Sequence, residues 1–259
     1  MNLGRTLVVA SNVFREVIRD RVLYIIGFFA LILIAAAILI PEIAASNEDK
    51  IIIDIGLAAM NLFGLVVTIF VGTALINKEI EKRTVYVLIA KPVSRAEFIV
   101  GKHVGLSAVL AVLLGAMTAI FLAVLSVKQI SYPVGSIFLT VLFQFLELSL
   151  IAGVAILFGV FTSSLIAMML TLAVYLMGNF SRDIVTLGNL AENPGIRQVT
   201  QNLYLVLPDL SRFNLKNEAI YGMTLLPQPL DLLGSAVYGL VWIGLVLAIA
   251  VLIFSRREF

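Results

Sequence analysis

The fold of this chain is decided by one charged stretch in an otherwise apolar sequence, NKEIEKRTVYVLIAKPVSRAEFIVGKH at residues 77–103. This charged segment holds six Lys and Arg residues and three Glu residues, and apolar runs long enough to cross a bilayer lie on both sides of it. Basic loops between membrane spans are retained on the cytoplasmic side. The sequence therefore predicts a membrane protein whose charged segment faces the cell interior and can act as a docking surface there.

The composition of the chain indicates a lipid environment. Of 259 residues, 61% are hydrophobic and 13% are charged, and the mean hydropathy is +1.09. A soluble domain of this length cannot bury so much apolar surface. The chain has no cysteine, which excludes disulfides, thiolate metal sites and cysteine nucleophiles. Its single histidine, His103, cannot build a multi-histidine metal site, so we expect neither a metal site nor a bound cofactor in this chain.

Six apolar runs predict an all-α membrane protein with six transmembrane helices. A helix needs about 20 apolar residues to cross the bilayer core, and five runs meet that length. The fifth run in the chain is shorter and follows the break Thr162-Ser163-Ser164, which predicts a helical hairpin with a cytoplasmic turn. The predicted spans are 22–40, 55–76, 104–127, 134–161, 165–180 and 235–254.

The distribution of basic residues sets the orientation of these spans. With six spans both termini lie on one side of the membrane, together with the charged segment. That side collects 12 of the 18 Lys and Arg residues. The side with the larger number of basic residues is the cytoplasmic side. We therefore expect both termini in the cytoplasm and one membrane domain over residues 22–259.

Residues 1–21 have the pattern of an amphipathic helix ahead of the first span. Basic residues such as Arg5, Arg15 and Arg19 lie mostly opposite an apolar stripe, which is typical of a helix lying in the membrane interface. An ordinary basic anchor is the simpler alternative. The stripe consists of Leu3, Leu7, Ala10, Phe14, Val17 and Ile18.

The largest segment outside the spans is 181–234, which we expect on the extracytoplasmic side. Prolines such as Pro194 and Pro208 prevent it from forming one helix. Its stretches 203–207 and 219–226 are too apolar for a free loop. The sequence predicts short pieces that pack on, or dip into, the outer face of the membrane domain.

The charged segment itself divides at Pro92. Residues 77–91 have helical amphipathic spacing, and Pro92 should end that helix because it lacks an amide hydrogen and restricts Lys91. Ser94 and Glu97 then form a capping box for a second helix that continues into the third span. The pattern predicts a short helix across the cytoplasmic mouth, and a solvated loop is the alternative.

These residues give the charged segment a family resemblance. It resembles the cytoplasmic loop of ABC transporter permeases of the ABC type-2 family, whose pattern is Glu, three residues, Gly-Thr, a leucine-rich stretch, Pro-x-Ser-Arg and Gly-Lys. Arg83 stands where the family usually has glycine. Within 181–234, the stretch from Leu207 to Asn214 resembles permeases grouped with copper-enzyme maturation systems. The matching positions in the charged segment are Glu79, Thr84, Leu88, Pro92, Ser94, Arg95, Gly101 and Lys102.

The resemblance implies a permease subunit, usually of an exporter, in a prokaryotic plasma membrane. It implies pairing with a second permease subunit, identical or paralogous, and with separate ATPase subunits that bind ATP and Mg. Consistent with this, Gly101-Lys102 is the one Gly-Lys pair, and it lacks the surrounding residues of a P-loop. The residues expected to bind the ATPase are Glu79, Glu81, Arg83, Thr84, Leu88, Pro92 and Arg95.

Glu147 is the acidic outlier of the fourth predicted span. An acid at mid-span costs on the order of 3 kcal/mol, so its side chain should face protein or water. It is a candidate for the substrate pathway or for proton handling. The alternative is a helix-packing contact to Asn61, Thr68 or Asn179 on other spans.

Two other features have structural interpretations. Gly101 and Gly105 form a G-x-x-x-G pattern, which allows close helix approach and is weak support for a dimer seam. His103 is expected to be solvated at the headgroup level.

Two further function classes compete with the permease. A secondary transporter or channel could use Glu147, but such proteins more often show paired repeats. An intramembrane enzyme is disfavoured because these spans contain no constellation of catalytic residues. Nucleic acid is not an expected partner, membrane lipid is, and the cargo stays open among lipids, peptides and small toxic compounds.

Overall fold

A computed structural model describes residues 2–19, 23–43, 47–81, 94–191, 193–221 and 226–256, and all secondary structure elements in these ranges are helices. Five of them are long and apolar enough to cross a membrane (α2, α3, α5, α6 and α11), and α7 with α8 forms a pair bent by 63° that can count as a sixth. The predicted all-α membrane fold is thus confirmed. The elements are α1 (Leu3–Val17), α2 (Leu23–Ile43), α3 (Glu48–Glu81), α5 (Arg95–Val127), α6 (Val134–Phe161), α7 (Ser164–Asn179), α8 (Ser181–Leu190), α9 (Pro194–Val206), the 3₁₀ helix η2 (Leu210–Phe213), α10 (Lys216–Tyr221) and α11 (Pro229–Arg256).

Local sequence signals account for where several helices begin and end. The predicted capping box is present: the Ser94 hydroxyl accepts from the amide of Glu97, and the Glu97 carboxylate accepts from the amide of Ser94. Pro133 stands immediately before α6, where a missing amide hydrogen costs nothing. Thr162 ends α6 in an extended conformation. Asn193 caps α9 by accepting from the Gly195 amide.

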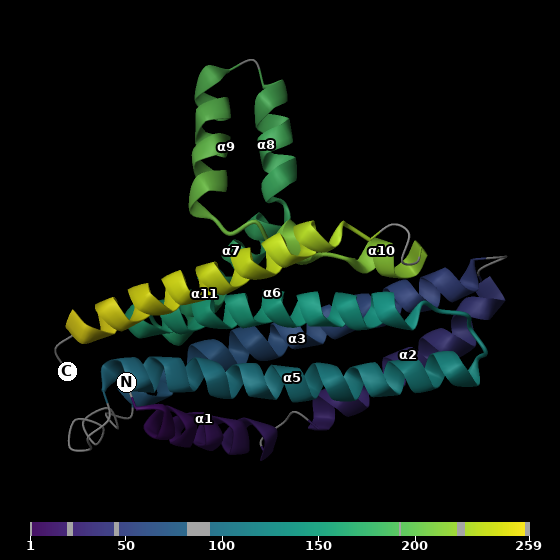
Figure 1. Ribbon diagram of the computed structural model, residues 1–259, viewed down its shortest axis with the longest axis horizontal. Coiled ribbons are helices and arrows are strands. Elements are labelled where there is room, and N and C mark those ends of the chain that lie inside the picture. The colour runs from purple at the N-terminus through teal and green to yellow at the C-terminus, as the bar shows by residue number, and fades with distance from the viewer. Residues whose placement is uncertain are drawn as a thin grey trace.

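Helix α6 is the centre of the bundle. It packs against α3, α5, α7 and α11, and the long helices run side by side (Figure 1). Apolar burial drives association weakly in lipid, so close approach and van der Waals contact matter more. Gly64 and Gly72 of α3 provide that approach, because Leu148 and Ala155 of α6 lie where their side chains would be.

Helix α1 lies alongside the first half of α5 (Figure 1). A Cβ atom on Gly101 would lie 2.7 Å from Cβ of Val9, and one on Gly105 would lie 2.7 Å from the Ala10 carbonyl oxygen. The G-x-x-x-G pattern therefore receives α1 of the same chain, which corrects its interpretation as a dimer seam.

The apolar stripe of α1 is not the face that packs on α5, and its predicted place in the membrane interface stays a prediction. Leu3 and Leu7 are 72% and 61% exposed and point away from the bundle. Small and β-branched residues of α1 contact α5 instead, because Gly101 and Gly105 have no side chain and let the two helices approach closely. The buried residues of α1 are Thr6, Ala10, Val13 and Val17.

The segment between α7 and α11 folds as a helical hairpin followed by η2 and α10. The hairpin, α8 with α9, stands out from the bundle (Figure 1). No residue of α9 is buried, and Leu205 and Val206 are exposed, so 203–207 does not pack on the bundle. The alternative part of that prediction, that the stretch dips into the outer face of the membrane, stays a prediction. Helices α8 and α9 pack on each other instead, with Gly188 facing Thr200. Residues 222–225 of the predicted stretch 219–226 lie outside the described residues.

Candidate functional site: the charged end of the bundle and two polar centres

The charged segment connects the end of α3 to the beginning of α5 at the end of the bundle where α1 begins and α11 ends. Residues 82–93 lie outside the described residues, and so do the side chain of Glu81 and the helix predicted before Pro92. Four predicted ATPase-binding residues fall in that range: Arg83, Thr84, Leu88 and Pro92. Glu79 and Arg95 lie on either side of it and are described.

Glu97 joins the beginning of α5 to the beginning of α1. One oxygen of its carboxylate accepts from the Ser94 amide at 2.9 Å, and the other accepts from the Asn2 amide at 2.6 Å. The Glu97 side chain is buried. One carboxylate therefore caps α5 and also fixes α1 beside it, because hydrogen bonds to a charged acceptor are stronger than neutral ones.

Arg95 joins the beginning of α5 to the end of α11. Its guanidinium donates to the carbonyl oxygen of Phe254 at 3.1 Å and also to that of Ser255. These carbonyls belong to the last turn of α11, where a helix has unpaired acceptors and a partial negative charge. The side chain predicted to bind a partner thus caps a neighbouring helix.

Glu79 joins the end of α3 to α5 through an ion pair with Lys102. Lys102 is buried, and its ammonium group also lies 5.3 Å from the ring centroid of Phe98. Phe98 stacks on Phe254 of α11 with 5.6 Å between the ring centroids. A buried cation with one anionic partner is costly to leave unpaired, so this pair fixes the end of α3.

Together these contacts form what we call the α5 clamp, defined by Glu97, Arg95 and the pair Glu79–Lys102. It links the first two turns of α5 to α1, α3 and α11 at once. A separate apolar cluster around Ile99 and Phe254 packs at the same end of the bundle. A force applied to residues 82–93 would therefore reach four helices through short contacts.

Glu147 lies at the crossing of α3, α6 and α7 and is only 2% exposed. Its two carboxylate oxygens accept from the amide groups of Asn61 and Asn179, each at 3.0 Å. Tyr175 of α7 donates to Asn61 at 2.7 Å. We call these four residues the polar network. Two of the three predicted packing partners are confirmed, whereas Thr68 donates to the Gly64 carbonyl of its own helix.

His103 is buried rather than solvated. Its Nε2 atom lies 2.9 Å from the Ser149 carbonyl oxygen of α6. The residue stands two turns inside α5, and α6 covers the face that it occupies. The expectation of a headgroup-level histidine was wrong because the sequence does not reveal which face of α5 meets α6.

A second polar centre surrounds Asp209, between the hairpin and α11. Its carboxylate accepts from Arg182 Nε at 3.2 Å, from Arg212 Nε at 3.1 Å and from Ser211 at 2.6 Å. Ser181 and Tyr204 also donate to it, and its own amide donates to Tyr238 of α11 at 2.8 Å. These contacts fix the root of the hairpin to the last span.

The pKa of Asp209 reflects this environment. Burial on its own would raise the pKa of the carboxyl, but hydrogen bonds from Ser211 and Ser181 and the charge of Arg182 outweigh it. The pKa therefore lies below the ordinary value of an aspartate, and the group is held in its charged form.

The sequence did not single out Asp209 as a polar centre. Its nearest partners, Ser211 and Arg212, are two and three residues along the chain. A short acceptor placed just after a proline and before two donors is a local signal that could have found it. The links from Arg182 and Tyr238 depend on the fold and leave no such pattern.

The fold and these sites define a polytopic membrane protein in which the described ends of the charged segment, 77–81 and 94–103, contact several spans. The sequence profile described as "ABC-2 family transporter protein" matches residues 7–259, and the chain belongs to this family. No curated protein matches the chain. The chain is accordingly a multi-pass membrane component of an ABC transporter.

Proposed function

We propose that this chain is the permease subunit of an ATP-driven exporter and that residues 82–93 receive a separate ATPase subunit on the cytoplasmic side. ATP and Mg would be bound and hydrolysed by that partner, and the chain itself would have no catalytic residue. Two permease subunits, identical or paralogous, would form the translocation pathway. Membership of the ABC-2 family supports this assignment, because that family typically works with an ATPase subunit.

The observation that carries the proposal is the α5 clamp. A docking loop can drive transport only if its displacement moves the spans. If such a loop were attached to two helix ends alone, local bending would absorb its displacement. Here the clamp connects the helix after residues 82–93 to α1 and α11, and the Glu79–Lys102 pair closes the connection to α3. A displacement of residues 82–93 would then be passed to four helices.

A secondary transporter or channel that uses Glu147 is the second candidate function. Both carboxylate oxygens of Glu147 already accept hydrogen bonds from side-chain amides. A satisfied acid with packing partners on two other helices fits a structural role better than a transport role. We therefore place this alternative behind the permease.

The test is purification of the tagged chain from its native membrane in a mild detergent, with identification of co-eluting proteins by mass spectrometry. A double variant, Arg83→Glu with Leu88→Asp, changes residues 82–93 and leaves the clamp intact. The matched control is Arg197→Glu with Leu205→Asp, the same two replacements on exposed α9. We expect a P-loop ATPase with the wild type and the control and its loss from the double variant. Equal recovery from all three proteins, or no ATPase from any, would refute the proposal.

A further inference from the structure

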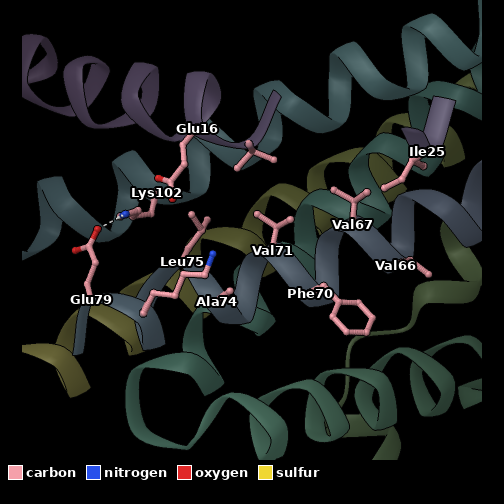
Figure 2. A pocket seen from close by; sticks show the side chains of 12 residues that line it. Glu16, Ile25, Val66, Val67, Phe70, Val71, Ala74, Leu75, Glu79 and Lys102 are labelled. Atoms are coloured by element: carbon pink, nitrogen blue, oxygen red, sulfur yellow. Dashed lines mark hydrogen bonds and ion pairs between the residues drawn. The ribbon is translucent and has the colours of Figure 1, made fainter. Parts of the chain in front are cut away.

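A cavity of about 550 Å³ lies between α1, α2 and α3 and reaches Lys102 of α5. It has two chemically different ends. Figure 2 shows Glu16, Glu79 and Lys102 together at one end, and Val66, Val67 and Ile25 toward the other. Long cavities with one apolar end and one charged end match amphiphiles rather than compact polar ligands.

The apolar part of the cavity is open toward the side of the helix bundle. Val71 and Leu75 of α3 form its wall, while Phe70 is 60% exposed and Val66 is 39% exposed. These residues belong to a helix apolar and long enough to cross a membrane. The opening therefore faces the hydrocarbon, and an acyl chain can reach the cavity without passing through water.

The charged end lies where the apolar run of α3 stops, at the level expected for lipid headgroups. Two lysines and two glutamates line it: Lys78, Lys102, Glu16 and Glu79. Lys102 and Glu79 are paired with each other. Lys78 and Glu16 are exposed on two different helices, and no ion pair between them is found among the described residues. The described residues that line this end are thus neutral in sum but offer one further cation and one further anion.

We propose that this cavity binds an aminophospholipid of the phosphatidylethanolamine type. One acyl chain occupies the apolar part along α3, the phosphate lies between Lys78 and Lys102, and the ammonium group lies at Glu16. The site needs no ATPase, so its failure would leave the proposed function untouched, and failure of the proposed function would leave the site untouched.

Charge complementarity selects this headgroup over an anionic one. A phosphate alone would gain the two lysines but would place a net negative charge beside Glu16 and Glu79, which is unfavourable. A zwitterionic headgroup keeps the charged end neutral in sum and gives each exposed charge a partner. Primary ammonium also donates hydrogen bonds to a carboxylate, which the quaternary ammonium of a choline lipid cannot do.

The experiment uses the full chain in nanodiscs of equal parts phosphatidylethanolamine and phosphatidylglycerol, with a trace of either lipid carrying a photoactivatable group on its acyl chain. Labelled peptides are identified by mass spectrometry. We expect the phosphatidylethanolamine probe to concentrate on residues 66–75 of α3. Ala74→Trp places an indole in the cavity and should remove that label. Ala108→Trp adds the same indole to an exposed position of α5 that does not line the cavity and should leave it.

The headgroup is tested by two conservative variants at exposed positions, where folding is little affected. Glu16→Gln should abolish the preference for phosphatidylethanolamine over phosphatidylglycerol. Lys78→Gln should weaken labelling by both probes about five-fold, because one basic residue near a phosphate strengthens binding by about that factor.

Three results would overturn the proposal. Labelling spread evenly over all lipid-facing helices and unchanged by Ala74→Trp would show annular lipid only. Equal labelling by both probes in the wild type would refute the headgroup assignment. Protection of residues 66–75 from both probes, with cross-links between two copies of α3, would show that a second copy covers the cavity.

Discussion

The close contact between α1 and α5 gives the sharpest stability prediction. A methyl group added at Gly105 would lie 2.7 Å from the Ala10 carbonyl oxygen and 2.7 Å from Cβ of Val13. Carbon atoms pack at about 3.5–4.0 Å, so α1 must move by about 1 Å. Overpacking of this kind costs about 1–3 kcal/mol. Because one of the obstructing atoms is backbone, a rotamer change cannot relieve the contact.

Gly115→Ala is the matched control for Gly105→Ala. Both replacements are in α5, and both gain about 1 kcal/mol of helix propensity. A Cβ at Gly115 meets nothing within 4 Å. The difference between the two variants therefore isolates the clash with α1 from the helix propensity.

The assay is thermal unfolding in detergent, together with thiol labelling of α1. A difference of about 1–3 kcal/mol should lower the Tm of Gly105→Ala by about 2–12 °C relative to Gly115→Ala. The chain has no cysteine, so Thr6→Cys introduces a single buried thiol on the contact face of α1. That thiol should react faster with maleimide in the Gly105→Ala background. Equal Tm values and equal labelling rates in the two backgrounds would refute the close contact of α1 with Gly105.

Three further predictions address the clamp and the polar centres. Arg95→Gln removes a charged cap from the last turn of α11. Amide hydrogen exchange in that turn, measured by mass spectrometry, should therefore become about two- to five-fold faster. Unchanged exchange would mean that the cap does not stabilise the end of α11. Glu147→Leu leaves the amides of Asn61 and Asn179 without their acceptor and should cost about 1–3 kcal/mol of stability, while Glu147→Gln should keep transport in vesicles. Loss of a pH-dependent transport activity in Glu147→Gln would instead favour the secondary transporter. Because the pKa of folded Asp209 lies below its unfolded value of about 3.9, its stabilising effect should be complete above that pH and decline as the pH falls through the folded pKa. The Tm difference between wild type and Asp209→Asn should therefore be large at pH 7 and shrink near pH 3; a difference independent of pH would contradict this.

The parts of the fold that depend on short-range signals could be predicted from the sequence. The apolar run 134–161 coincides with α6 (Val134–Phe161), because Pro133 and Thr162 mark its two ends. The capping box of Ser94 and Glu97 is likewise a local pattern. Runs of apolar residues and helix caps act within a few turns, so they are readable along the chain.

The contacts that build the candidate site could not be predicted in the same way. Glu97 meets Asn2 across 95 residues of sequence, and Arg95 meets Phe254 across 159. Glu97 was expected to cap α5 and Arg95 to bind the ATPase, and the sequence gives no sign of their contacts with Asn2 and Phe254. His103 failed for a related reason, since its burial depends on the face of α5 that α6 covers.

Glu147 lies between these two cases. Placing an acid in a membrane span costs free energy unless the acid has polar partners, and few polar side chains lie on the other spans. That reasoning led to Asn61, Thr68 and Asn179, of which Asn61 and Asn179 are observed partners. Tyr175 was missed because a tyrosine in a span is also explained by its aromatic ring.

The central claim, that residues 82–93 receive a separate ATPase on the cytoplasmic side, is tested most directly by cross-linking from one engineered thiol. The variant Leu88→Cys carries the thiol in that range, and the variant Val199→Cys carries it on exposed α9 as the control for the opposite side of the membrane. In intact cells, a membrane-impermeant maleimide should label the Val199→Cys variant and leave the Leu88→Cys variant unlabelled. In inside-out vesicles, a short thiol cross-linker should join the Leu88→Cys variant to a P-loop ATPase, and ATP with vanadate should change the yield. Labelling of the Leu88→Cys variant from outside the cell, or the absence of any ATPase adduct on it, would contradict the account.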